Sequence, residues 1–229
     1  MMSLSKMLSG MRPLEYVEYG LLCLFVICMA ISWELATKVL MLLSVSLVAK
    51  CVAARRVGNP ALTSAGRWAM ALMLAFFGLQ ALSMLYSTNQ VDGWDVLVKH
   101  LPFLLFPLLF LLSDTAYLTR DHVRAVLYLF SVTLIVRFAV RLAVALWGIL
   151  VEGTPWNFWT FDPMHHAYLS MYTLLALVFV FNELFYHSQD MPAYMRPLLV
   201  VDGLVMMVYT YLVQSRSGVL CMALQLLGM

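Results

Sequence analysis

Residues 123–150 read VRAVLYLFSVTLIVRFAVRLAVALWGIL, a long and almost uninterrupted apolar run. About 20 mainly apolar residues are enough for one helix to cross a bilayer. The run lacks the alternation of polar and apolar residues that indicates a half-buried strand, so its pattern predicts a helix. We therefore interpret residues 123–150 as a membrane-spanning helix.

Similar apolar runs, separated by short polar connections, fill most of the remaining chain. They cover residues 20–33, 36–54, 67–86, 96–112, 164–186, 197–214 and 217–229. Of the 229 residues, 63% are hydrophobic and 11% are charged, whereas soluble domains have roughly 45–50% and 25%. The last run is too short to span a bilayer. The sequence predicts an all-α, polytopic integral membrane protein with about seven complete transmembrane helices and a short final apolar segment, in a single domain over residues 1–229.

Two places are predicted to interrupt these helices. The polar stretch Ser32-Trp33-Glu34 joins two apolar runs and predicts a tight helical hairpin with an interfacial tryptophan. Pro102 and Pro107 lie within a third run. Because proline has no backbone N–H, we expect a kinked or partly broken helix there.

The basic residues are distributed unevenly between alternate connections. One side holds Lys6, Arg12, Lys50, Arg55, Arg56, Arg67, Arg120, Arg124 and Arg196, and the other holds Lys38, Lys99 and Arg216. Cytoplasmic segments carry the excess of Lys and Arg, so we expect a cytoplasmic N-terminus, with residues 87–95, 151–163 and 215–217 on the opposite face. The small net charge of +2 argues against a nucleic-acid partner.

Arg137 and Arg141 lie four residues apart in the apolar run at 123–150. On a helix they would share one face, and two neighbouring cations in a membrane need anions. A phosphate or pyrophosphate would suit them, because the guanidinium fork matches phosphate oxygens. Three alternatives stay open: the arginines snorkel outward or pair with Glu152 and Asp162, they pair internally in a structural membrane subunit, or they line the anion path of a non-enzymatic transporter.

His165 and His166 begin another apolar run. Adjacent residues on a helix point about 100° apart and do not share a metal as an i, i+4 pair would, so no metal site is predicted. Either imidazole could act as acid, base or hydrogen-bond donor, since histidine titrates near neutral pH; an interfacial structural role is the alternative. The sequence also lacks a phosphate-binding glycine loop, and no cofactor is predicted.

Aromatic, amide and carboxylate groups gather in residues 86–95 and 152–159, both expected on the outer face. This combination suits carbohydrate. The alternative is an aromatic belt at the membrane interface, where Trp and Tyr are commonly found.

Four short segments resemble the O-antigen ligase and polymerase superfamily. They are Leu-Tyr-Ser-Thr-Asn at 85–89, Pro-Leu-Leu-Phe at 107–110, Met-His-His-Ala-Tyr-Leu-Ser-Met-Tyr at 164–172 and Gln-Ser-Arg-Ser-Gly-Val-Leu at 214–220. The Ser-Arg-x-Gly element before an apolar helix is the most recognisable motif of that superfamily. In this order along a polytopic chain, the four segments are moderately specific.

The resemblance implies a function at the outer face of a bacterial inner membrane. Members of the superfamily transfer or polymerise glycans carried on undecaprenyl pyrophosphate, with a lipid A-core or another glycan as acceptor, and they need no metal or nucleotide. Arg216 matches the motif arginine, and Arg137 or Arg141 corresponds to another family arginine. The family continues with a large periplasmic loop and further helices, so we expect this chain to be the N-terminal part of a longer protein.

Overall fold

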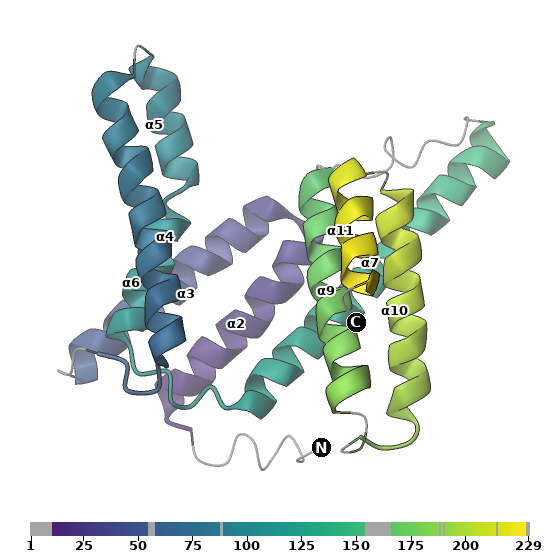
Figure 1. Cartoon of the computed structure of the whole chain (residues 1–229), viewed down its shortest axis with the longest axis horizontal. Coiled ribbons are helices and arrows are strands. Elements are labelled where there is room, and N and C mark those ends of the chain that lie inside the picture. The colour runs from purple at the N-terminus through teal and green to yellow at the C-terminus, as the bar shows by residue number, and fades with distance from the viewer. Residues whose placement is uncertain are drawn as a thin grey trace. The chain divides into compact units, whose positions relative to one another are not determined.

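The computed structural model describes residues 11–54, 58–87, 89–153, 166–187, 189, 191–213 and 215–227. Within these ranges every regular element is a helix (Figure 1). The elements are α2 (Pro13–Ile31), α3 (Trp33–Ala54), α4 (Ser64–Ser83), the 3-10 helix η1 (Met84–Tyr86), α5 (Gln90–Lys99), α6 (Pro102–Leu112), α7 (Arg120–Glu152), α9 (His166–Tyr186), α10 (Met195–Leu212) and α11 (Arg216–Leu227).

Seven helical segments in the described ranges are long and apolar enough to cross a membrane. They are Pro13–Ile31, Glu34–Val52, Ser64–Tyr86, Gln90–Leu112, Arg120–Val151, His166–Tyr186 and Met195–Leu212. The last helix, α11, is apolar but has only 12 residues. The protein is therefore an all-α, multi-pass membrane protein, and the predicted seven spans with a short final segment are confirmed.

Both predicted interruptions are found. Helix α2 ends at Ile31 and α3 begins at Trp33, which makes the expected tight hairpin. The fourth span breaks between α5 and α6, directly before Pro102, and the His100 ring nitrogen Nδ1 lies 2.8 Å from the carbonyl oxygen of Val96 at this break. Pro107, in contrast, lies inside α6 without ending it.

The chain forms two compact units. Unit 1 contains the described parts of Cys23–Thr37 and Asp121–Met229, and unit 2 those of Leu8–Leu22 and Lys38–Arg120. The hairpin of α2 and α3 contributes to both. The predicted site residues Arg137, Arg141 and Arg216 all belong to unit 1.

In unit 1, α9 and α10 pack side by side and α11 lies against both, while α7 runs obliquely to them (Figure 1). The core cluster joins Leu134 of α7, Leu177 of α9 and Met206 of α10. A second cluster joins Phe138 of α7 to Tyr209 of α10, with ring centroids 4.7 Å apart. These contacts hold together the helices that carry the predicted site.

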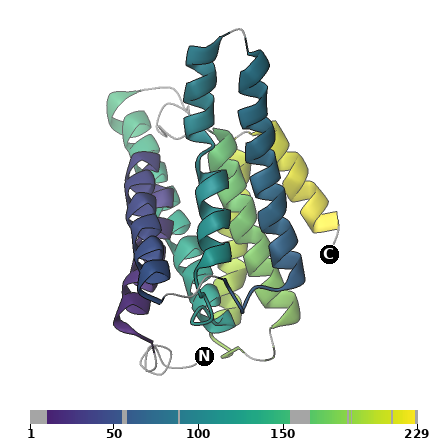
Figure 2. The same ribbon diagram turned by 90° about the vertical axis from the view of Figure 1, so that its left-hand side faces the viewer.

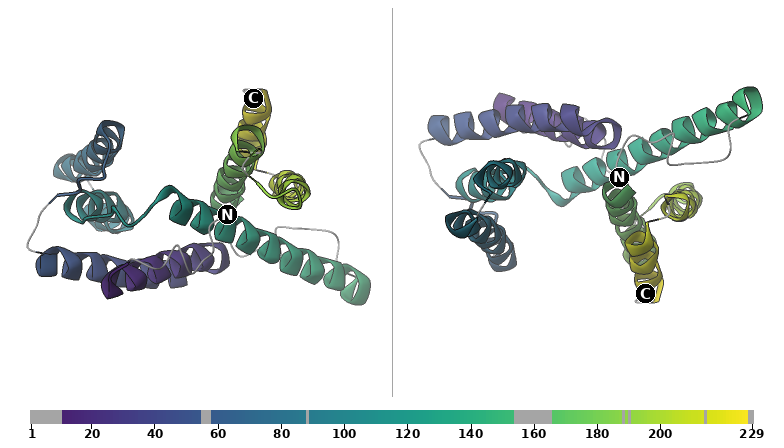
Figure 3. Two further views of the ribbon diagram at one scale, coloured as in Figure 1. Left: turned by 90° about the horizontal axis from the view of Figure 1, so that it is seen from below. Right: turned by 90° about the horizontal axis from the view of Figure 1, so that it is seen from above.

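In unit 2, α4 packs along α6 and also contacts α5, as Figures 2 and 3 show. Its core joins α3 to α6 through Leu43, Leu47 and Leu109. No residue of α4, which is described throughout, is buried. The side of α4 that does not pack on α6 exposes large apolar side chains, including Trp68, Leu72 and Leu79, as expected for a span that faces lipid.

Candidate functional site

The Gln-Ser-Arg-Ser-Gly motif contains the cap of α11. The hydroxyl Oγ of Ser215 accepts a hydrogen bond from the backbone N–H of Gly218 at 3.3 Å, and its carbonyl oxygen accepts from Val219 N at 2.9 Å. A serine in this position satisfies an N–H group that the first turn of a helix cannot pair internally. Ser215 is therefore the residue that caps the start of α11.

The glycine of the motif lets α11 approach α9 closely. A Cβ atom added at Gly218 would lie 2.7 Å from Cβ of Ser170 in α9, closer than real Cβ contacts. At the same place, the Ser170 hydroxyl donates to Oγ of Ser215 at 3.2 Å, and Oγ of Ser215 lies 3.1 Å from Oγ of Ser217. Ser215 and Gly218 are thus explained by packing and capping.

Arg216 has no comparable structural role. It is the first residue of α11, its side chain is exposed, and it makes no ion pair with another described residue. It lines a depression of about 490 Å³ together with Tyr211, Leu212 and Val219. The N-terminus of a helix carries partial positive charge, so the guanidinium and the helix end both favour an anion at this place.

Arg137 is buried and binds the end of another helix. Its Nη1 atom donates to the carbonyl oxygens of Ala30 and Ile31, the latter at 3.1 Å. These are carbonyls of the last turn of α2, which have no partner within their own helix. The C-terminal end of a helix carries partial negative charge, which here balances part of the positive charge of Arg137. A phosphate ligand was predicted because Arg137 and Arg141 need anions, and this contact supplies part of that negative charge.

Arg141, one turn further along α7, is half-buried. Leu142 beside it packs against the same cluster as Leu212 at the end of α10. Arg216 follows the end of α10 after a short connection. The part of α7 that carries Arg137 and Arg141 therefore lies at the same end of unit 1 as the start of α11.

His166 is the first residue of α9 and is exposed. It belongs to the same end of unit 1, because Ser170, about one turn further along α9, contacts Ser215 at the start of α11. His165 lies outside the described residues, as does Asp162. In the described part of the chain, no three His, Cys, Asp or Glu side chains gather as metal ligands would.

Sequence reasoning missed a buried polar cluster at the other end of unit 1. Arg124 of α7 binds Glu183 of α9 through two hydrogen bonds, Nε to Oε1 at 2.9 Å and Nη2 to Oε2 at 2.5 Å. The Tyr128 hydroxyl donates to Oε2 of Glu183 at 3.1 Å. A paired guanidinium and carboxylate with a third donor form a strong contact, which fastens α7 to α9.

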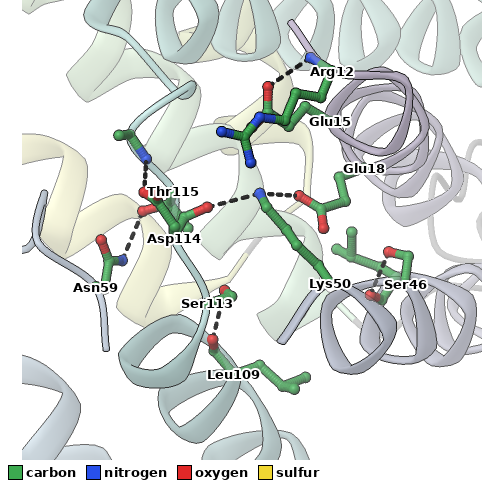
Figure 4. Close-up of polar contacts among 12 residues, drawn as sticks. Arg12, Glu15, Glu18, Ser46, Lys50, Asn59, Leu109, Ser113, Asp114 and Thr115 are labelled. Atoms are coloured by element: carbon green, nitrogen blue, oxygen red, sulfur yellow. Dashed lines mark hydrogen bonds and ion pairs between the residues drawn. The ribbon is translucent and has the colours of Figure 1, made fainter. Parts of the chain in front are cut away.

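A second such cluster joins three segments of unit 2 (Figure 4). Lys50 of α3 donates from Nζ to Glu18 of α2 at 2.9 Å and to the carbonyl oxygen of Asp114 at 2.7 Å. Its ammonium group lies 4.2 Å from the centre of the Tyr117 ring. Burial and the neighbouring Glu18 carboxylate raise the pKa of the Tyr117 hydroxyl above its ordinary value. The position of both buried charges is explained by this pairing.

The stretch expected to form an outer connection at residues 87–95 is partly helical. The Asn89 side chain accepts a hydrogen bond from Asp92 N at 3.4 Å and caps α5, which begins at Gln90. Tyr86, Asn89 and Asp92 line a cavity of about 390 Å³ between α4 and α5. The sequence predicted a loop over this stretch, because its polar residues are more typical of a connection than of the start of a helix.

The chain matches no family model, no curated protein and no solved structure. The functional interpretation therefore depends on the residues themselves and on the motif resemblance.

Proposed function

We propose that this multi-pass membrane protein binds an undecaprenyl-pyrophosphate-linked glycan through Arg216, and that it takes part in transferring or polymerising that glycan. The acceptor would be a lipid A-core or a second glycan. The membrane would be a bacterial inner membrane, with the N-terminus in the cytoplasm and Arg216 on the periplasmic side. The alternative is a non-enzymatic transporter or a structural membrane subunit.

One observation carries the proposal. Of the three residues that define the Ser-Arg-x-Gly motif, Ser215 caps a helix and Gly218 permits a close helix crossing. Arg216 is left with an exposed guanidinium beside a depression. Arg216 differs from an ordinary exposed arginine in that its side chain lines a depression at the start of a helix, where the helix end also favours an anion.

The chemistry of the group fits the proposed ligand. Arginine presents a planar fork of donors that matches two phosphate oxygens at once. Tyr211 and Leu212, which line the same depression, would contact the apolar part of the lipid carrier. In glycan transfer the pyrophosphate is the leaving group, so a cation that holds it also stabilises the charge that develops as the bond to the sugar breaks.

Binding of undecaprenyl pyrophosphate to the purified chain in nanodiscs tests the proposal, with undecaprenol as the uncharged control ligand. Hydrogen bonds to charged groups contribute about 1.5–3 kcal/mol, so Arg216→Ala should weaken binding roughly 10- to 100-fold. The affinity of Arg216→Lys should lie between those of the unaltered protein and of Arg216→Ala. An ammonium group keeps the positive charge but lacks the planar fork of donors.

Arg67→Ala is the matched control, since Arg67 is also an exposed arginine in the first turn of a helix, α4. It should bind the lipid as the unaltered protein does. Equal binding by Arg216→Ala and Arg67→Ala, or equal affinity for undecaprenol and its pyrophosphate, would show that Arg216 is not a pyrophosphate ligand. Release of free undecaprenyl pyrophosphate from a glycan-loaded carrier then separates a transferase from a protein that only binds.

A further inference from the structure

Three carboxyl side chains are buried among the described residues of the membrane spans, and only two of them have a cation. Glu18 pairs with Lys50 at 2.9 Å, and Glu183 pairs with Arg124 at 2.5 Å. Asp202, in the middle of α10, is buried as well. The two glutamates show how this protein keeps a buried carboxylate charged, and Asp202 departs from that arrangement.

Among the described residues, one hydroxyl group binds the Asp202 carboxyl group. Ser131 of α7 donates from Oγ to Oδ2 of Asp202 at 2.5 Å. The second oxygen, Oδ1, is buried and accepts no hydrogen bond from the described residues. Leu199 and Met206, about one turn away on either side, belong to the core of unit 1.

The two arginines of α7 that lie nearest in sequence to Ser131 are engaged elsewhere. Arg124 and Tyr128 of α7 both bind Glu183 of α9, and Arg137 of α7 binds the carbonyls that end α2. On α10 itself the nearest basic residue, Arg196, is six positions away, which is about 9 Å along the axis.

We propose that Asp202 is a proton-binding site, held at neutral pH as a carboxylic acid in the interface of α7 and α10. The proton is on Oδ1, and Oδ2 is the carbonyl-like oxygen that accepts from Ser131. A buried carboxylate without a cation costs far more than a neutral acid with one hydrogen bond. Asp202 thus contributes no charge to the core of unit 1 as long as its proton is bound.

Infrared spectroscopy of the whole protein in lipid at neutral pH tests this directly. A protonated carboxyl group has a C=O stretching band above the amide band, and the band shifts when the exchangeable proton is replaced by deuterium. We expect one such band in the unaltered protein and its loss in Asp202→Asn. Glu18→Gln and Glu183→Gln should keep the band, since both glutamates are paired as carboxylates.

Ser131→Ala provides a second readout that does not remove the acid. Loss of the donor to Oδ2 should move the C=O band of Asp202 to higher frequency without changing its area. Absence of the band from the unaltered protein, or a band that is the same in Asp202→Asn and does not move in Ser131→Ala, would overturn the proposal. Neither result depends on whether Arg216 binds a lipid.

Discussion

Replacing Gly218 by alanine is expected to loosen the crossing of α11 over α9. The added Cβ would lie 2.7 Å from Cβ of Ser170 and 3.1 Å from its Oγ. Carbon atoms in contact are normally about 3.5–4.0 Å apart. Since the nearest atom is bound directly to the backbone of Ser170, it cannot swing away as the end of a long side chain would. The two helices must therefore separate by about 1 Å.

Two effects of this separation lower the free energy of unfolding. Overpacking of a well-packed contact typically costs about 1–3 kcal/mol. The hydrogen bond between Ser170 and Ser215, already 3.2 Å long, would stretch beyond hydrogen-bonding range; such bonds between membrane helices contribute about 0.6 kcal/mol on average. We expect Gly218→Ala to lower the free energy of unfolding by about 2 kcal/mol, or roughly 30-fold in the unfolding equilibrium.

Equilibrium unfolding in mixed detergent micelles measures this difference, with Gly78→Ala as the matched control. Gly78 lies within α4 and has no atom within 4 Å of an added Cβ. That variant should be as stable as the unaltered protein or gain up to about 1 kcal/mol from the higher helix propensity of alanine.

Adding Ser170→Gly to Gly218→Ala removes the clashing atom and should recover part of the loss, which a double-mutant cycle would report as coupling between the two positions. If Gly218→Ala unfolds at the same detergent composition as Gly78→Ala, or if the two substitutions add without coupling, α11 does not cross α9 in the way described.

Three further outcomes follow from the buried charges. Arg137→Ala should destabilise the protein by about 2 kcal/mol or more, because two carbonyls at the end of α2 lose their donor; Arg141→Ala should cost less, and unfolding in micelles compares the two. Lys50→Met should destabilise by about 3–5 kcal/mol since it leaves the Glu18 carboxylate buried alone, and combining it with Glu18→Leu should recover most of the loss in the same assay. Folding raises the pKa of the Tyr117 hydroxyl, so the unfolded chain loses this proton at a lower pH than the folded protein. The free energy of unfolding should therefore fall as the pH rises above about 10. Unfolding curves over a series of pH values should show a smaller fall in Tyr117→Phe.

Apolar run length predicts the spans well because the bilayer sets a minimum length for each helix. The run at 123–150 lies within α7, which continues by a few residues at each end. The start of α5 was harder to predict, since residues 90–95 are largely polar and only the cap at Asn89 marks the helix. Composition thus predicts the membrane-embedded part of a helix better than its polar end.

The contacts between helices could not be predicted from one sequence. The pair of Lys50 and Glu18 joins residues 32 positions apart, and that of Arg124 and Glu183 joins residues 59 positions apart. Nothing in the local pattern distinguishes these partners from other charged residues of the same spans. The motif around Arg216 was different, because a serine, an arginine and a glycine so close together identified the place even though the separate roles of Ser215 and Gly218 required the structure.

The unequal lengths of α7 and α10 have a consequence for the lipid around them. With 33 residues, α7 is about 50 Å long, whereas α10 with 18 residues measures about 27 Å. A hydrocarbon layer is about 30 Å thick, so the short helix fits it nearly upright and the long one must lean or protrude. Phe138 and Tyr209 fasten the two helices to each other. A thinner bilayer should therefore change the angle between them, which would make the end of unit 1 that carries Arg216 responsive to membrane thickness.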